Sequence, residues 1–145
     1  MQPASKQVIA ISQASTTNAA TATGRIDTLG YDFLSLDVIT STSDDTTNNP
    51  SVLKLTEGDT TVISSASAID AFTGDDSDGF TIPASVTSGN WGVKFNVDLR
   101  PRKRYLFVSV SPLTTQVITA IGNLFKGETT PVNTTTASVK ALVEG

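Results

Sequence analysis

Apolar and polar residues alternate along several short stretches of the chain, most clearly over residues 90–99. Every second residue of that stretch is apolar, and the residues between them are mostly polar: Val93, Phe95, Val97 and Leu99 alternate with Lys94, Asn96 and Asp98. A period of two is typical of a strand with one buried face. Residues 105–111 alternate in the same way after a short connection. The pattern predicts two strands of one antiparallel sandwich, with these core residues: Phe95, Val97, Leu106 and Val108.

Further strands are predicted on the same grounds. Residues 8–11 and 80–83 are short candidates, and residues 51–57 followed by 60–64 are separated by a turn signal and predict a hairpin. Residues 70–79 form an acidic, glycine-containing loop. Together with the other stretches this makes about eight short strands with polar turns between them, which predicts an all-β fold, a single antiparallel β-sandwich.

Two stretches leave alternatives open. Over residues 31–39 the apolar phase flips between Phe33 and Leu34, which indicates either a β-bulge or a strand that is apolar on both faces. Residues 116–125 fit both helical and strand spacing, and their β-branched content favours a strand.

The first 24 residues are rich in Ala, Ser and Thr, and they predict an N-terminal arm ahead of a sandwich domain over residues 25–145. Such an arm is either poorly ordered or crosses to a neighbouring subunit, because chain ends fray unless something holds them.

Composition narrows the possible functions. The chain has no cysteine and no histidine, which removes disulfides, thiolate chemistry and the commonest general base and zinc ligand. Its net charge of −4 gives no overall attraction for nucleic acid. Apart from Lys6, the N-terminus offers only the apolar run 8–11, which is too short for a signal peptide or a membrane span. We therefore expect synthesis in a cytoplasm and no membrane partner.

Candidate chemistry is sparse. Serines are plentiful, but no histidine can activate one. The acidic pairs Asp44–Asp45 and Asp75–Asp76 lie in polar loops that predict solvated side chains, whereas a catalytic acid needs a sheltered site. The loop 74–79 invites a calcium interpretation, but an EF-hand alignment puts Gly74 and Ser85 where carboxylates are required. We expect no catalytic residues, no metal and no cofactor, and hence no enzyme.

One basic cluster stands out, holding four of the ten basic residues: Arg100, Arg102, Lys103 and Arg104. It is foremost interpreted as a charged turn between two strands. A second interpretation is an electrostatic contact with a capsid or with a neighbouring subunit, since such charges mainly set specificity and association rate. A nucleic-acid contact ranks third, because it calls for more positive charge. Trp91 stands alone and predicts a plug in the core or in an interface.

Three segments of the chain resemble a group of small virion proteins of tailed bacteriophages: residues 24–38, 49–59 and 93–106. The resemblance covers residues 25 to about 125. It implies a jelly-roll-like sandwich and a structural role as a capsid decoration, or cement, protein. Such a protein is made in the host cytoplasm and binds the major capsid protein on the outer surface of the phage head, which it stabilises.

Self-association is a further expectation. A hydrophobic content of only 38%, the lack of disulfides and the N-terminal arm predict that subunit contacts supply stability, and we expect a homotrimer. The alternative functions are a tail or fibre accessory domain and a carbohydrate-binding β-sandwich module.

Overall fold

The computed structural model describes residues 4–18, 20–41, 50–83, 91–127 and 141–144. Within these residues the chain forms nine strands and one short 3-10 helix, η1 (Ile63–Ser65). The strands are β1 (Ser5–Thr16), β2 (Ala22–Asp27), β3 (Phe33–Thr40), β4 (Val52–Gly58), β5 (Ser67–Thr73), β6 (Trp91–Asp98), β7 (Tyr105–Ser111), β8 (Gln116–Phe125) and β9 (Ala141–Glu144).

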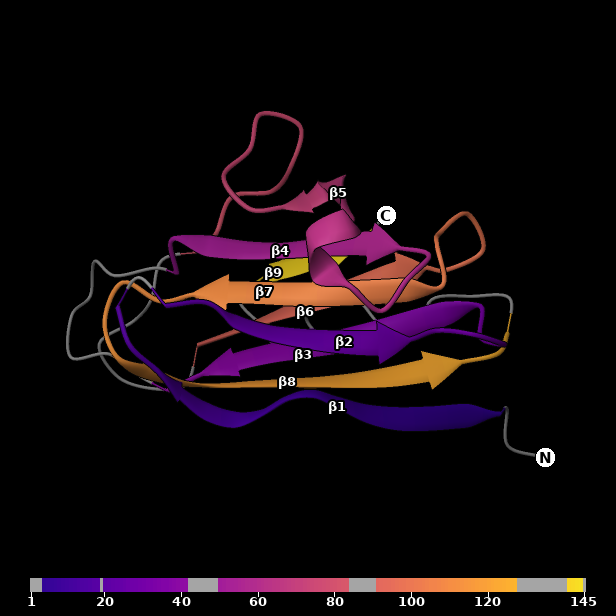
Figure 1. Ribbon diagram of the computed structural model, residues 1–145, viewed down its shortest axis with the longest axis horizontal. Coiled ribbons are helices and arrows are strands. Elements are labelled where there is room, and N and C mark those ends of the chain that lie inside the picture. The colour runs from indigo at the N-terminus through magenta and orange to yellow at the C-terminus, as the bar shows by residue number, and fades with distance from the viewer. Residues whose placement is uncertain (1–3, 19, 42–49, 84–90, 128–140, 145) are drawn as a thin grey trace.

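The strands form two packed sheets (Figure 1). The first sheet has the order β1-β8-β3-β6-β9, and the second sheet has the order β2-β7-β4-β5. The predicted all-β sandwich is confirmed. Its described strand pairs are antiparallel except for one, because β9 runs parallel to β6 at the edge of the first sheet.

The connectivity is that of a jelly roll. Strands pair outward from the β4–β5 hairpin: β3 pairs with β6, β2 with β7 and β1 with β8. The first eight strands thus form one long antiparallel ribbon that is rolled up. They are divided into two groups of four, β1-β8-β3-β6 and β2-β7-β4-β5, which pack face to face. This arrangement places the β2–β3, β4–β5 and β6–β7 connections at the same end of the sandwich.

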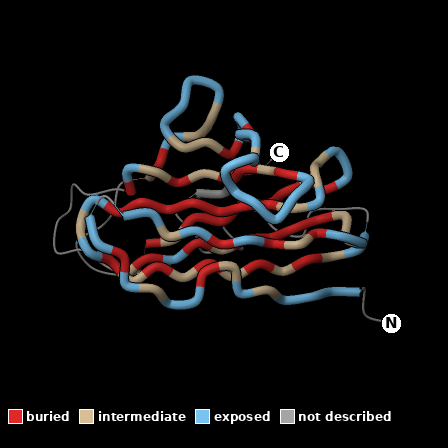
Figure 2. Tube along the Cα trace, viewed as in Figure 1, coloured by how far each residue is buried: buried red, intermediate tan, exposed pale blue. Residues whose placement is uncertain are grey.

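The core fills the space between the sheets, as the buried stretches of every central strand show (Figure 2). All four residues that the alternation assigned to the core are fully buried: Phe95, Val97, Leu106 and Val108. Phe95 meets Phe72 and Phe80 edge to face, with ring centres 5.9 and 5.5 Å apart. Trp91 is buried as well, and its Nε1 donates a 2.8 Å hydrogen bond to the Pro83 carbonyl, which confirms a core role.

The ambiguous residues 116–125 form a strand, β8, hydrogen-bonded on both sides to β1 and β3. Its even-numbered residues are buried and its odd-numbered residues are partly exposed. Burial thus alternates with a period of two, and the helical alternative is wrong.

The flipped apolar phase of β3 does not mark a bulge. Residues 33–40 keep an unbroken register with both β6 and β8. Leu34 faces the core, while Phe33 is buried on the outer face beneath the Arg100 guanidinium, which lies 5.0 Å from the ring centre. The strand is therefore apolar on both faces at this point.

The predicted N-terminal arm over residues 1–24 differs from the observed structure. Residues 5–16 form β1, which pairs with β8, and the predicted boundary at residue 25 falls inside β2. Two register shifts in β1, on either side of Ile11, break the alternation that would have revealed a long strand. Ile11 nevertheless reaches the core and ties the strand to it.

The region after β4 also differs from its prediction. The return strand of the hairpin is β5, over residues 67–73, and residues 63–65 form η1 instead of a strand. Ile69 and Phe72 anchor β5 in the core. They are three residues apart, which does not fit a period of two, so alternation did not reveal this strand. Residues 80–83 form no strand, but Phe80 makes a single bridge to Gly74 that closes the acidic loop.

Candidate functional site

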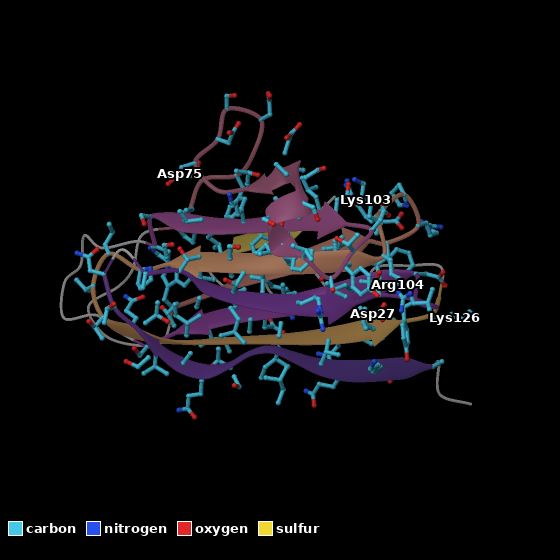
Figure 3. The ribbon with its side chains drawn as sticks, viewed as in Figure 1. Asp27, Asp75, Lys103, Arg104 and Lys126 are labelled. Atoms are coloured by element: carbon cyan, nitrogen blue, oxygen red, sulfur yellow. The ribbon has the colours of Figure 1, made fainter. Side chains whose placement is uncertain are left out.

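The basic cluster forms the connection between β6 and β7, which we call the basic turn (residues 100–104). Figure 3 places Lys103 and Arg104 at one end of the sandwich, close to Asp27 and Lys126, and Asp75 far from them. The turn lies beside the ends of β2 and β4 because these strands flank β7 in the second sheet. Carboxylates at or just after those strand ends therefore face three of the four cations, and Asp98 of β6 faces Arg100.

Arg104 forms a two-pronged ion pair with Asp27 at the end of β2. Its Nε and Nη2 donate to the two carboxylate oxygens at 3.0 and 2.8 Å, and the guanidinium lies 4.9 Å from the Tyr105 ring centre. The hydrogen bonds from Arg104 lower the pKa of Asp27 to about 2, against the opposing effect of burial. The Thr28 hydroxyl and backbone N–H both donate to the Arg104 carbonyl, which joins the β2 and β7 ends.

Arg100 pairs within its own turn. Its Nε and Nη2 donate to Asp98 at 2.9 and 2.6 Å while the guanidinium covers Phe33. These hydrogen bonds hold the pKa of Asp98 below its usual value. Arg100 thus shields an apolar ring on the outer face of the first sheet.

Arg102 and Lys103 meet acids from the end of β4. Glu57 accepts a 3.0 Å hydrogen bond from the Lys103 backbone N–H and lies 3.9 Å from the Arg102 Nη1. The Arg102 side chain is only 21% exposed and lies 6.0 Å from the Phe72 ring centre. Lys103 is 40% exposed, and its Nζ is 3.9 Å from Asp59. Of the four cations, Lys103 is held least tightly.

Each cation of the basic turn therefore faces a carboxylate of the same chain. Five acids contribute to this end of the molecule: Asp27, Glu57, Asp59, Asp98 and, through a hydrogen bond from the Gly127 N–H, Asp32. The charges largely cancel, so the interpretation as a charged, structure-forming turn is favoured over a free basic patch.

Two other cations have no carboxylate partner in the described part of the chain. Arg25 on β2 and Lys54 on β4 point outward from the second sheet, on either side of β7. The Arg25 Nη1 makes a long 3.4 Å contact with the Thr61 carbonyl. These residues are isolated in the sequence, and only strand pairing makes them neighbours, so no sequence signal indicated them.

A groove of about 320 Å³ lies on this outer face. Its lining combines hydroxyls, apolar side chains and one ammonium group: Thr21, Val52, Lys54, Thr56, Ile63, Ala66 and Ser109. The Thr56 hydroxyl is buried and has no hydrogen-bond partner among the described residues, whereas buried polar atoms are usually paired. We call this feature the hydroxyl groove.

The acidic loop (residues 74–80) is closed on itself. The Asp75 backbone N–H donates to the Phe80 carbonyl at 2.7 Å, and Asp75 Oδ1 accepts from the Ile82 N–H at 2.9 Å. Asp76 Oδ1 accepts from the Asp78 N–H at 3.3 Å. Asp75 and Asp76 thus brace the loop, and the described residues contain no group of three or more acidic side chains placed to hold a metal ion. Asp44, Asp45 and Ser85 lie outside the described residues.

An ion pair also joins two central strands of the first sheet. Lys94 Nζ lies 2.6 Å from Asp37 Oδ1 and donates to the Ser35 hydroxyl at 3.2 Å, and the lysine side chain is 11% exposed. The pair is satisfied and belongs to β3 and β6, so it is a structural feature of the sheet.

Ser51 and Lys54 have the Ser-x-x-Lys spacing found in some hydrolases. Around an extended strand, residues three apart point to opposite faces. The Ser51 hydroxyl donates to the Ser111 carbonyl, and Lys54 lines the groove, so this geometry does not unite them into a catalytic pair.

Among the residues that the structure describes, no helix has the length and apolar character needed to span a membrane. No protein-family model matches the chain, and no curated protein sequence matches it.

Proposed function

We propose that this chain is a structural virion protein that decorates the outer surface of a tailed-phage capsid and stabilises it. It binds the major capsid protein as a homotrimer and carries out no chemistry. The protein is made in the host cytoplasm, and its final location is the capsid surface.

The jelly-roll connectivity is the observation that carries the proposal. The resemblance of three segments to small phage virion proteins implies the same fold. Two of those segments include strands that pair directly, since residues 34–38 of β3 pair with residues 93–97 of β6, and residues 26–27 of β2 pair with residues 105–106 of β7. The resemblance therefore falls on parts of the sequence that meet in the folded sandwich.

The surface suits attachment to a repeating lattice. The end that carries the basic turn presents paired charges with partly exposed cations, and Lys103 and Arg104 are 40% and 44% exposed. Exposed charges of this kind contribute to specificity and association rate more than to affinity. Three copies joined in a trimer would raise the avidity of individually weak contacts.

A carbohydrate-binding module is less well supported. Sugar-binding platforms need exposed aromatic rings, and the residues that line the hydroxyl groove include none. On the same sheet Phe107 is buried, and the partly exposed Tyr105 is stacked against Arg104. The outer face of the second sheet is therefore hydroxyl-rich and cationic instead of aromatic.

Capsid binding can be tested by adding the purified chain to undecorated heads of its own phage and measuring occupancy. We expect saturable binding to the outer surface. For the double variant K103S/R104S we expect the affinity for the capsid, obtained from occupancy at low salt, to fall by up to about tenfold, because two exposed charges are lost. The difference should shrink at high salt, where such charges are already screened.

The control is K6S/K126S, which removes two exposed lysines outside the basic turn. Arg102 is left unchanged, since its largely buried side chain packs near Phe72 and its loss would disturb the fold. Equal occupancy of both double variants would show that the turn is only structural. Failure of the parent chain to bind any capsid would overturn the proposed function.

A further inference from the structure

We propose that the hydroxyl groove of one copy receives the acidic loop of a second copy, so that copies associate head to tail. This inference deepens the homotrimer in the proposed function and rests on that part of it, while binding to the capsid is a separate event. It names the two surfaces that meet: the outer face of the second sheet, and the loop over residues 74–80.

The groove offers positive charge that nothing in the described part of the chain neutralises. Thr23 on β2, Ser109 on β7 and Lys54 on β4 form one cross-strand row, and Arg25, Phe107 and Thr56 form the next. Arg25 lies beside the groove, two strand spacings across and two residues along from Lys54, so their backbones are about 12 Å apart. On a chain of net charge −4, this pair of cations favours a carboxylate as the occupant.

The lining of the groove fits a polypeptide. Thr21 and Ser111 share a 2.7 Å hydrogen bond at one end, and the unpartnered Thr56 hydroxyl lies at the other. A buried hydroxyl without a partner is unfavourable, and an incoming hydrogen-bond acceptor would relieve that penalty. Ile63, which is 42% exposed, forms an apolar rim. From the Ser111 row to the Phe107 row the groove extends over about 13 Å.

The acidic loop has matching properties. Its tip, residues 76–78, is exposed, and the Asp78 carboxylate makes no ion pair with any described residue. A three-residue tip spans at most about 10 Å, which fits within the groove. The hydrogen bonds to Asp75 and Asp76 hold the loop in shape before binding, so little conformational freedom is lost on contact.

The two surfaces lie on different sides of the molecule. In Figure 1 the loop that follows β5 rises above the edge of the sandwich, while β2, β7 and β4 turn the outer face of the second sheet toward the viewer. A contact between two unlike surfaces is heterologous, and it closes into a ring when the rotation between copies allows it. Three loops and three grooves would all be occupied in a trimeric ring.

Charge reversal tests the contact. The oligomeric state of the full chain is measured by light scattering at micromolar concentration and low salt. We expect K54E and D78K each to weaken association by more than about tenfold, because each places like charges together. The double variant K54E/D78K restores an opposite pair and should associate within about threefold of the parent. These losses should shrink at high salt.

Two matched controls make the same charge changes elsewhere: K126E on an exposed lysine and D70K on the exposed outer edge of β5. Unchanged melting temperatures show that each variant folds. A monomeric parent, controls that dissociate as much as K54E and D78K, or a double variant without recovery would overturn the inference. Capsid occupancy of the parent is measured in parallel, so loss of this contact and loss of the decoration function are distinguishable.

Discussion

The close approach of β2 to β1 leaves no room for a side chain at position 24. At this point β2 passes so close to β1 that a Cβ on Gly24 would lie 2.3 Å from the Ala10 carbonyl oxygen. We expect G24A to destabilise the fold by about 1–3 kcal/mol, since the backbone of β1 would have to move. Urea unfolding measures the change. G127A is the control, because a Cβ there would meet nothing within 4 Å, and equal losses in both variants would contradict the explanation.

Another prediction concerns acid. The pKa of Asp27 is about 2 in the folded chain against an ordinary 3.8, so its pair with Arg104 stabilises the fold above pH 3.8. That stabilisation is lost as the pH falls toward 2, where the folded-state carboxylate takes up its proton. Asp98 acts in the same direction.

The variant R104S removes the cause of this shift. We expect its unfolding midpoint in urea to fall less steeply between pH 4 and pH 2 than that of the parent, with a modest difference because the pair is well solvated. R25S is the control, since Arg25 forms no ion pair with Asp27. Parallel pH profiles for the parent and R104S would exclude the ion pair as a source of acid sensitivity.

The sequence revealed the cations of the basic turn but not their partners. Arg100, Arg102, Lys103 and Arg104 are nearly contiguous, so they are visible as a cluster. Asp27 and Glu57 arrive from the ends of β2 and β4, and they are adjacent only because both strands flank β7. The same reason hid the groove, because Lys54 in its lining and Arg25 beside it become neighbours only through strand pairing.

At the scale of elements, predictability follows from how each strand is buried. Strands β6 and β7 have a buried inner face and clear alternation, and both were predicted almost to the residue. Strand β5 holds only two buried apolar residues, and β1 is interrupted by two register shifts, so alternation failed for both. Both are edge strands of their sheets, and irregularities such as bulges concentrate at sheet edges.

Removal of residues 1–16 tests the role of β1. A dispensable arm could be deleted with little effect, whereas a strand of the first sheet cannot. We expect the truncated chain to lose at least about 4 kcal/mol of stability, or to aggregate, because β8 would become an exposed edge and Ile11 would leave the core. Thermal unfolding followed by circular dichroism measures the effect.

The control for this deletion removes residues 1–3 only, ahead of β1. It should melt within a few degrees of the parent. If the chain that lacks residues 1–16 melted as cooperatively and at the same temperature as this control, the pairing of β1 with β8 would contribute nothing to stability.

At the scale of the whole molecule, alternation predicted a sandwich but not its strand order. A period of two tells which residues face the core, and it says nothing of which strands pair. The order β1-β8-β3-β6 depends on contacts between opposite ends of the chain, and only the resemblance to phage virion proteins implied a jelly roll. Function is harder still to predict from the sequence, because a contact surface carries no catalytic motif that a sequence could reveal.

The pairing of β1 with β8 also determines when, during translation, β1 can join its sheet. The two strands are roughly 100 residues apart in the chain, and a ribosome adds about 5–20 residues per second. The first strand therefore waits on the order of 5–20 s for its partner to be translated. During that interval its backbone groups and Ile11, which the folded sandwich buries, are open to other chains. Newly made copies on neighbouring ribosomes would be the nearest of these, so translation rate and chaperones should govern how much of the protein reaches its native form.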